Sequence, residues 1–334
     1  MEELDREITA YNIPLDFKIT GDLDLLLLQE SIDFLVRRHD SLRTVFPDQD
    51  GQPFQRILPD ISSRINVVHL EHDPNEKQDE ILALHSLNHA TRKFDLRKGP
   101  LFHFELLVLD NNEYLFLANF HHIVSDATSV GIFFNELQTI YTSLSEGAPV
   151  SLPEIPMHYA DFAIREKEWI TTPEYRRQLD FWKQELEGAP DMLQLPTDRR
   201  RPKMQTYRGT EYHFTIGGSL RQRIAELGKR HRTGLFVPLL TAFSTLLSRY
   251  ASQQDLIIGV PVANRREEDL DQLVGVLINT LPLRLNLTDP LSFSEAIETV
   301  KRKFGAAFEN QEVPFERLVE ELKVKRNTGT SPLF

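Results

Sequence analysis

The residue types that could support chemistry are concentrated in one stretch of the chain, residues 119–129 (NFHHIVSDATS). An imidazole has an unperturbed pKa of about 6.5 and can therefore accept a proton near neutral pH. Adjacent side chains of an extended chain point to opposite faces, so His121 and His122 cannot both enter one cavity. One is then a candidate reactive group and the other a packed one. The alternative is that both are structural histidines with buried partners.

A metal centre is a second chemical hypothesis for this stretch. Its ligands would come from His103, His121, His122 and Asp126, whose side chains are of types that bind zinc. The two adjacent histidines diverge, however, and the chain contains no Cys that could complete a closed zinc shell. We therefore expect no metal at this site.

The stretch is expected to join a strand to a helix. Residues 113–121 have the length and apolar content of a buried strand, and residues 100–110 are predicted to be its hairpin partner. After residue 127 the apolar spacing becomes three and four, as on one face of a helix. Asp126 or Thr128 is well placed to cap the first turn of that helix.

Composition indicates an ordinary folded chain and excludes several functions. The 334 residues are 40% hydrophobic and 26% charged, with a formal net charge of −12. So acidic a chain is poorly suited to nonspecific binding of nucleic acid or anionic membranes. No apolar run has the length of a membrane span, and the acidic start (MEELD) does not resemble a signal peptide. The absence of Cys excludes disulfides and is compatible with a cytoplasmic location.

Strands and helices alternate in both halves of the chain, which favours an α/β fold with two lobes. We place an N-terminal lobe at residues 1–187, a linker rich in proline and arginine at 188–209, and a C-terminal lobe at 210–334. Besides the elements already named, the expected strands are 11–20, 211–216, 256–262 and 276–287. The expected helices are 23–38, 76–93, 157–163, 174–186, 220–230, 236–250, 292–311 and 316–322.

Six blocks of sequence, taken in order, resemble the condensation domain of nonribosomal peptide synthetases, within the chloramphenicol-acetyltransferase-like acyltransferase superfamily. The signature His-His-x-x-x-Asp-Gly stands here as His121-His122-Ile-Val-Ser-Asp126-Ala127. The other five blocks are residues 38–46 (RHDSLRTVF), 159–163 (YADFA), 274–280 (VGVLINT), 310–316 (NQEVPFE) and 326–334 (RNTGTSPLF). The resemblance covers nearly the whole chain.

The resemblance implies two lobes in a V shape with a tunnel between them. Two peptidyl carrier proteins, upstream and downstream, would insert 4′-phosphopantetheine arms that bear the donor thioester and the acceptor amino acid. Amide-bond formation would follow, in an assembly line that also contains an adenylation domain. The chain itself would hold no covalently bound cofactor.

The resemblance also assigns roles to individual residues. It implies that His122 faces the tunnel and that His121 is structural. It also implies that Asp126 holds the turn through a salt bridge to an arginine from the second lobe, such as Arg284. Supporting positions are Arg43, Ala127 and Asn279. The cations around Arg43 either brace the site or form a solvated helix end.

Two roles remain open for His122. It could accept the proton of the attacking amine, a contribution of typically about 10²–10⁴-fold, or it could orient the amine. Backbone N–H groups at the start of the following helix could also stabilise an oxyanion.

The chain departs from the family pattern in ways that keep other functions open. Ala127 replaces the signature glycine, which would disturb the turn if this position needs a positive φ. Against the family pattern the chain also looks truncated at both ends. The alternatives are a catalytically silent module that acts as a binding platform for carriers or enzymes, and a family variant that catalyses epimerisation or ester formation.

Overall fold

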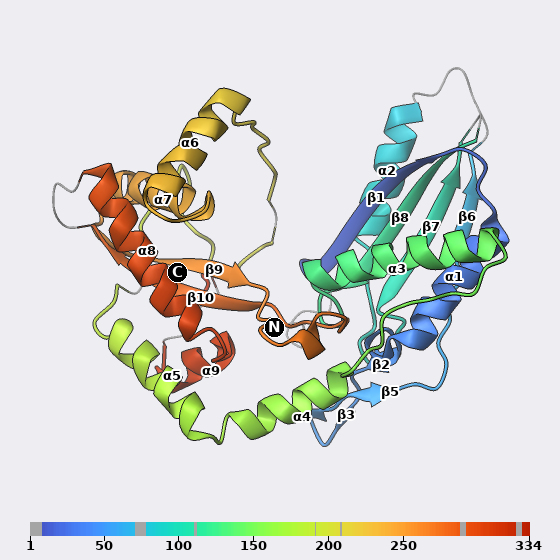
Figure 1. Ribbon diagram of the computed structural model, residues 1–334, viewed down its shortest axis with the longest axis horizontal. Helices are drawn as coiled ribbons and strands as arrows, with labels where there is room; N and C mark the ends of the chain where they lie inside the picture. Colours follow the sequence, from blue (N-terminus) through green and yellow to red (C-terminus); the bar gives the residue numbers. More distant parts are fainter. Residues whose placement is uncertain are drawn as a thin grey trace. The chain divides into compact units, whose positions relative to one another are not determined.

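The computed structural model describes residues 9–70, 78–109, 112–190, 192–207, 209–287, 292–324 and 329–334. The chain divides into two compact units (Figure 1). The first unit comprises Met1–Glu166 and Arg265–Leu277, and the second comprises Lys167–Asn264 and Ile278–Phe334. The described residues of 188–209 contain no helix or strand and belong to the second unit. The two-lobe boundary predicted at these residues stays a prediction.

The first unit is built on a four-stranded sheet in the order β1-β8-β7-β6. The strands are β1 (Asn12–Thr20), β6 (Asn66–His69), β7 (Phe102–Val108) and β8 (Glu113–His121). β8 pairs antiparallel with both β1 and β7, and β6 pairs parallel with β7. The predicted β7–β8 hairpin is therefore confirmed, although residues 110–111 of its turn lie outside the described residues.

The two faces of this sheet differ because side chains alternate along a strand. On one face Phe104, Phe116 and Phe120 pack against α1 (Leu25–Arg38) and α3 (Ala127–Ser145) in one buried apolar cluster. On the other face His103 and Asn119 contact α2 (Gln78–Ala90) through polar groups. The apolar face therefore holds α3, which begins six residues after the last residue of β8, against the sheet.

Short elements complete the first unit. The 3₁₀ helix η1 (Asp40–Arg43) leads into β2 (Thr44–Val45), which pairs with β5 (Arg56–Ile57). β3 (Asp48–Gln49) pairs with β4 (Gln52–Pro53), and α4 (Tyr159–Trp169), which follows α3, belongs to this unit as far as Glu166. A second 3₁₀ helix, η2 (Glu268–Leu270), lies in the distant part of the chain that returns to this unit.

The second unit contains a two-stranded antiparallel sheet of β9 (Asp255–Val262) and β10 (Asn279–Asn286). Its helices are α5 (Pro173–Glu185), α6 (Gly218–Arg230), α7 (Phe236–Ala251), α8 (Phe293–Glu309) and α9 (Phe315–Glu321). Trp182, Leu283 and Ile297 are among the buried residues of its core. These helices and strands agree with the predicted ones to within a few residues.

The strand predicted at residues 211–216 is wrong. Residues 209–217 form neither helix nor strand and are exposed throughout. Tyr212 and Phe214 alternate with polar residues, as they would in a half-buried strand, yet both side chains are largely exposed. A strand also needs a partner for its backbone groups, and no described strand pairs with this segment.

Within the described residues, no helix is both long and apolar enough to cross a bilayer.

A buried ionic group joins α3 to the end of α1. The carboxylate of Glu136 accepts hydrogen bonds from Arg38 Nε at 3.0 Å and from His39 Nε2 at 2.8 Å. Burial opposes the charged form of Glu136, but the hydrogen bonds from His39 and Arg38 together lower its pKa below the ordinary value. The first two residues of the block at 38–46, Arg38 and His39, thus serve an internal contact with α3.

Replacing Glu136 by glutamine should lower the free energy of unfolding at pH 7 by about 1–3 kcal/mol, because a charge-assisted buried hydrogen-bond group is lost. A depressed pKa stabilises the fold above the unfolded-state pKa, and this contribution is lost as the pH falls through the folded-state pKa. The difference between the two proteins should therefore shrink in acid. Urea unfolding at several pH values measures it, with the exposed Glu30→Gln change on α1 as the control. A difference that is constant with pH would contradict the assigned charge.

Candidate functional site

The candidate site lies where β8 ends and the chain turns into α3. The backbone N–H of His121 donates to Leu101 O at 2.8 Å, and that of His122 donates to Tyr11 O at 2.7 Å. A turn follows, in which Val124 N–H donates to His121 O at 3.1 Å. The sheet therefore fixes the backbone of both histidines.

The two histidine side chains have different surroundings, as the alternation of an extended chain predicts. His121 is 4% exposed, and its Nδ1 accepts the backbone N–H of Ile123 at 3.1 Å, so the neutral ring carries its proton on Nε2. The rings of Tyr11 and Phe94 lie close to it. His122 is only half-buried, and its imidazole makes no hydrogen bond or ion pair with any residue that the structure describes. Of the two rings, the structure leaves that of His122 open to a reactant.

Asp126 braces the far end of the turn. It is the N-cap of α3, as predicted, and its Oδ1 accepts the backbone N–H of Ser129 at 2.8 Å. Its Oδ2 accepts the backbone N–H of Leu277 at 3.0 Å. The carboxylate is almost completely buried, so these donors replace the water that it has lost.

The cation that pairs with Asp126 is Arg265, and the prediction of Arg284 is wrong. Arg265 Nη2 lies 3.3 Å from Asp126 Oδ1, and both side chains are buried. Burial lowers the pKa of the Arg265 guanidinium, while the charge of Asp126 acts in the opposite direction. Arg284 lies on β10 and pairs instead with Asp255 at 2.7 Å, a hydrogen bond that raises the pKa of Arg284.

Ala127, in place of the signature glycine, is compatible with the turn. It is the first residue of α3, is exposed, and is not among the non-glycine residues with positive φ. Only a positive φ would favour glycine at this position. The backbone here therefore accepts alanine without strain.

The other two predicted supporting residues, Arg43 and Asn279, make their hydrogen bonds to other parts of the chain. Arg43 donates to Val36 O at 3.1 Å and to Leu58 O at 2.6 Å, and so ties α1 to the segment after β5. Asn279 acts in the second unit, where its Nδ2 donates to Gln311 O at 2.7 Å. Both hold chain junctions rather than a reacting group.

The metal hypothesis finds no support in the geometry. His103 Nδ1 lies 3.3 Å from His89 Nδ1, on the sheet face that α2 covers. Burial, the charge of Arg92 and the neighbouring His89 lower the pKa of His103 to about 4. Among the described residues, no group of three or more potential ligands is arranged to hold a metal ion.

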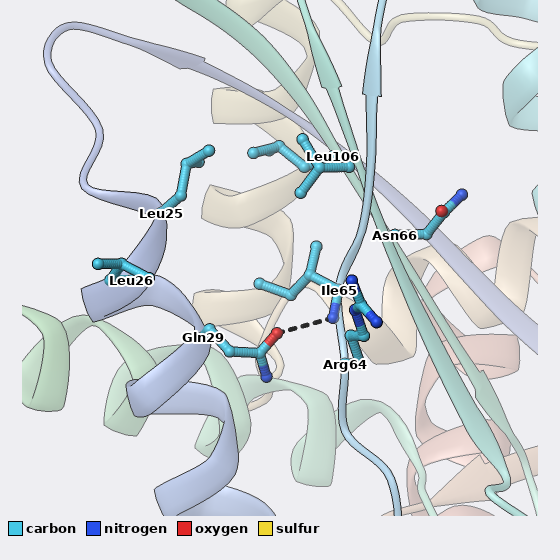
Figure 2. A pocket seen from close by; sticks show the side chains of 8 residues that line it. Leu25, Leu26, Gln29, Arg64, Ile65, Asn66 and Leu106 are labelled. Carbon is cyan, nitrogen blue, oxygen red and sulfur yellow. Dashed lines mark hydrogen bonds between the residues drawn. The ribbon is translucent and has the colours of Figure 1, made fainter.

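A surface pocket of about 530 Å³ lies elsewhere in the first unit, between α1 and β6 (Figure 2). Leu25, Leu26 and Leu106 contribute its apolar wall, and the backbone N–H of Ile65 donates to Gln29 Oε1 at 2.8 Å. None of its lining residues comes from the turn at 121–126. We therefore do not assign the chemistry to this pocket.

The site can supply one imidazole, that of His122, on a backbone fixed by the sheet, and no carboxylate of the described residues is hydrogen-bonded to that ring. Both oxygens of Asp126 are engaged by other donors, so Asp126 and His122 do not form the base and orienter of a catalytic triad. Sequence reasoning missed Arg265, which lies in a loop rich in charged residues, and it missed the contacts of Ser129. An Asp-x-x-Ser spacing at a helix start was the available signal for the second.

The family model that matches this chain is that of the condensation domain, and it covers residues 1–334. One polypeptide of the linear gramicidin synthase of Brevibacillus parabrevis is 39% identical over 325 residues. That alignment spans 97% of this chain but only 4% of the length of the synthase polypeptide. The dimodular nonribosomal peptide synthase of Bacillus subtilis is 37% identical over 331 residues, which span 97% of this chain and 14% of that protein.

Solved structures show the same fold. The X-domain from teicoplanin biosynthesis matches with a TM-score of 0.87 at 24% identity, over 99% of this chain and 75% of that one. A four-domain nonribosomal peptide synthetase, solved with AMP and glycine, matches with a TM-score of 0.87 at 22% identity, over 99% of this chain and 25% of that one. The predicted mixed fold of helices and sheets is confirmed.

Proposed function

Because the chain belongs to the condensation-domain family, we propose that it forms an amide bond in nonribosomal peptide synthesis. Condensation domains catalyse amide formation and work with carrier proteins that bear phosphopantetheine. The donor here is an acyl or peptidyl thioester on an upstream peptidyl carrier. The acceptor is an amino acid on a downstream carrier, loaded by an adenylation domain of the same assembly line.

The observation that carries this proposal is the exposure of the His122 side chain and its lack of a hydrogen bond to the described residues. Its imidazole is half-exposed and makes no hydrogen bond with the described residues, while its backbone is held by Tyr11. Protein side chains that only stabilise a fold normally find partners when they leave water. An unpartnered ring on a fixed backbone is suited to meet a substrate.

His122 orients the acceptor amine and takes its proton. The amine nitrogen attacks the thioester carbonyl, a C–N bond forms, and the C–S bond breaks as the carrier thiolate leaves. The proton released by nitrogen passes through His122 Nε2 or Nδ1 to the thiolate. An α-amino group has a pKa of about 7.7–8.0, so a useful fraction is neutral without a strong base. Positioning of two tethered reactants then supplies much of the acceleration.

The direct test mixes the protein with two carriers, one loaded with an acyl thioester and one with an aminoacyl thioester. Mass spectrometry of the acceptor carrier should show a gain of one acyl group, at a rate well above that of the two carriers alone. An acceptor whose amine is acetylated should give no product. Carrier binding without amide formation by the folded protein would contradict the proposal and favour a non-catalytic platform.

A further inference from the structure

Residues 265–277, which we call the strap, leave the second unit after β9, belong to the first unit, and return to β10. We propose that Ser129, Gly275 and Tyr159, which we call the clasp, are positioning residues for amide formation. They hold the strap against the first turn of α3 and thereby fix the turn that carries His122. This inference rests on the proposed function, and its test separates the two.

Ser129 is the centre of the clasp. It is 0% exposed, and its hydroxyl oxygen lies 2.8 Å from Asp126 Oδ1 and 2.8 Å from Gly275 O. A hydroxyl has one proton and can donate to only one of these acceptors at a time. The same oxygen accepts the backbone N–H of Gly275 at 3.0 Å. Ser129 therefore links the buried carboxylate to both polar backbone groups of one strap residue.

The ring of Tyr159 packs against the same residue, Gly275. A Cβ built on Gly275 would lie only 2.1 Å from Cδ2 of the Tyr159 ring, so the ring occupies space that any larger residue would need. Its hydroxyl donates to Val276 O at 3.0 Å. The blocks at 159–163 and 274–280 thus meet in space, and glycine at 275 is required by a close approach rather than by its φ.

The clasp acts on the reaction through Asp126. The turn that carries His122 is fixed at its first end by the sheet, through Tyr11 O, and at its second end by the capping carboxylate. Asp126 Oδ2 in turn accepts from Leu277 of the strap. Loss of the clasp would loosen the turn only at the end held by Asp126. The His122 ring would then shift slightly, and small displacements of a positioned group can cost about 100-fold in rate.

The test compares Ser129→Ala and Ser129→Cys with the unaltered protein. Cysteine keeps a side chain of similar size with a weak donor, so the kcat for amide formation should fall in the order Ser, Cys, Ala, by about tenfold or more for alanine. KM for each loaded carrier should stay within about twofold, since the clasp is internal. Hydrogen exchange of the Gly275 and Leu277 amides should become faster in the same order, by about tenfold for alanine.

Ser143→Ala is the matched control, because Ser143 lies on the same helix and donates to Thr139 O at 2.9 Å near the surface. It should leave both the strap amides and kcat unchanged. Faster exchange with unchanged kcat would overturn a positioning role, and unchanged exchange would overturn the clasp itself. If the unaltered protein forms no amide, the proposed function and the positioning role both fail, while hydrogen exchange still reports whether Ser129 holds the strap. Gly275→Ala disturbs the same strap by displacing the Tyr159 ring. It should likewise lower kcat and speed the hydrogen exchange of the Leu277 amide.

Discussion

Replacing His122 by alanine is expected to lower the kcat for amide formation by about 10²–10⁴-fold, the range of a lost proton acceptor in a positioned site. The fold should be almost unaffected, because the ring is half-exposed and makes no hydrogen bond with the described residues. The free energy of unfolding, measured with urea, should therefore change by no more than about 0.5 kcal/mol. The measurement is the rate of acyl transfer between loaded carriers, beside an unfolding curve of the same preparation.

Two further variants sharpen this experiment. His213→Ala removes an imidazole whose side chain is 87% exposed and should leave the rate unchanged. His122→Gln keeps hydrogen-bonding groups but cannot take up a proton near neutral pH. If the glutamine variant is much faster than the alanine variant, most of the rate contribution of His122 comes from orienting the amine rather than from accepting its proton. A folded alanine variant with more than half of the original kcat would exclude any catalytic role for His122.

Replacing Asp126 by alanine is expected to lower the free energy of unfolding by about 3–5 kcal/mol, because it leaves the Arg265 guanidinium buried without its counter-charge. The Arg265 side chain is only 5% exposed. The change also removes the cap of α3, which is typically worth about 1 kcal/mol. Urea unfolding at neutral pH measures the sum.

Asp24→Ala provides a matched control, since Asp24 caps α1 in the same way but at the surface. It should cost only the capping contribution of about 1 kcal/mol. The double change Asp126→Ala with Arg265→Met should recover part of the loss, because the orphaned charge is then absent. Equal losses for Asp126→Ala and Asp24→Ala would show that the buried ion pair adds nothing.

Local patterns were sufficient to predict the elements around the site. A run of apolar residues with the length of a buried strand, followed by a change to a spacing of three and four, located β8 and α3, and the residue type at 126 predicted the cap. These features depend on neighbours within a few residues, and such short-range preferences can be recognised in a single sequence.

Long-range pairings could not be predicted in the same way. Arg265 and Asp126 are 139 residues apart, and the loop around Arg265 has the composition of a solvated segment. Arg284 was an equally plausible partner by charge, and only its place beside Asp255 on the β9–β10 sheet excludes it. Tyr212 and Phe214 fail for a related reason, because alternation does not tell whether a partner strand is present.

The return of the strap to the first unit also bears on how such domains can be recombined. Because Arg265–Leu277 belongs with Met1–Glu166, the unit that holds the histidine motif is discontinuous in the gene. A chimera joined anywhere between residues 167 and 264 would place Asp126 and Ser129 of one parent against Arg265 and Gly275 of another. Exchanging both segments together keeps these interlocking residues in their inherited combination.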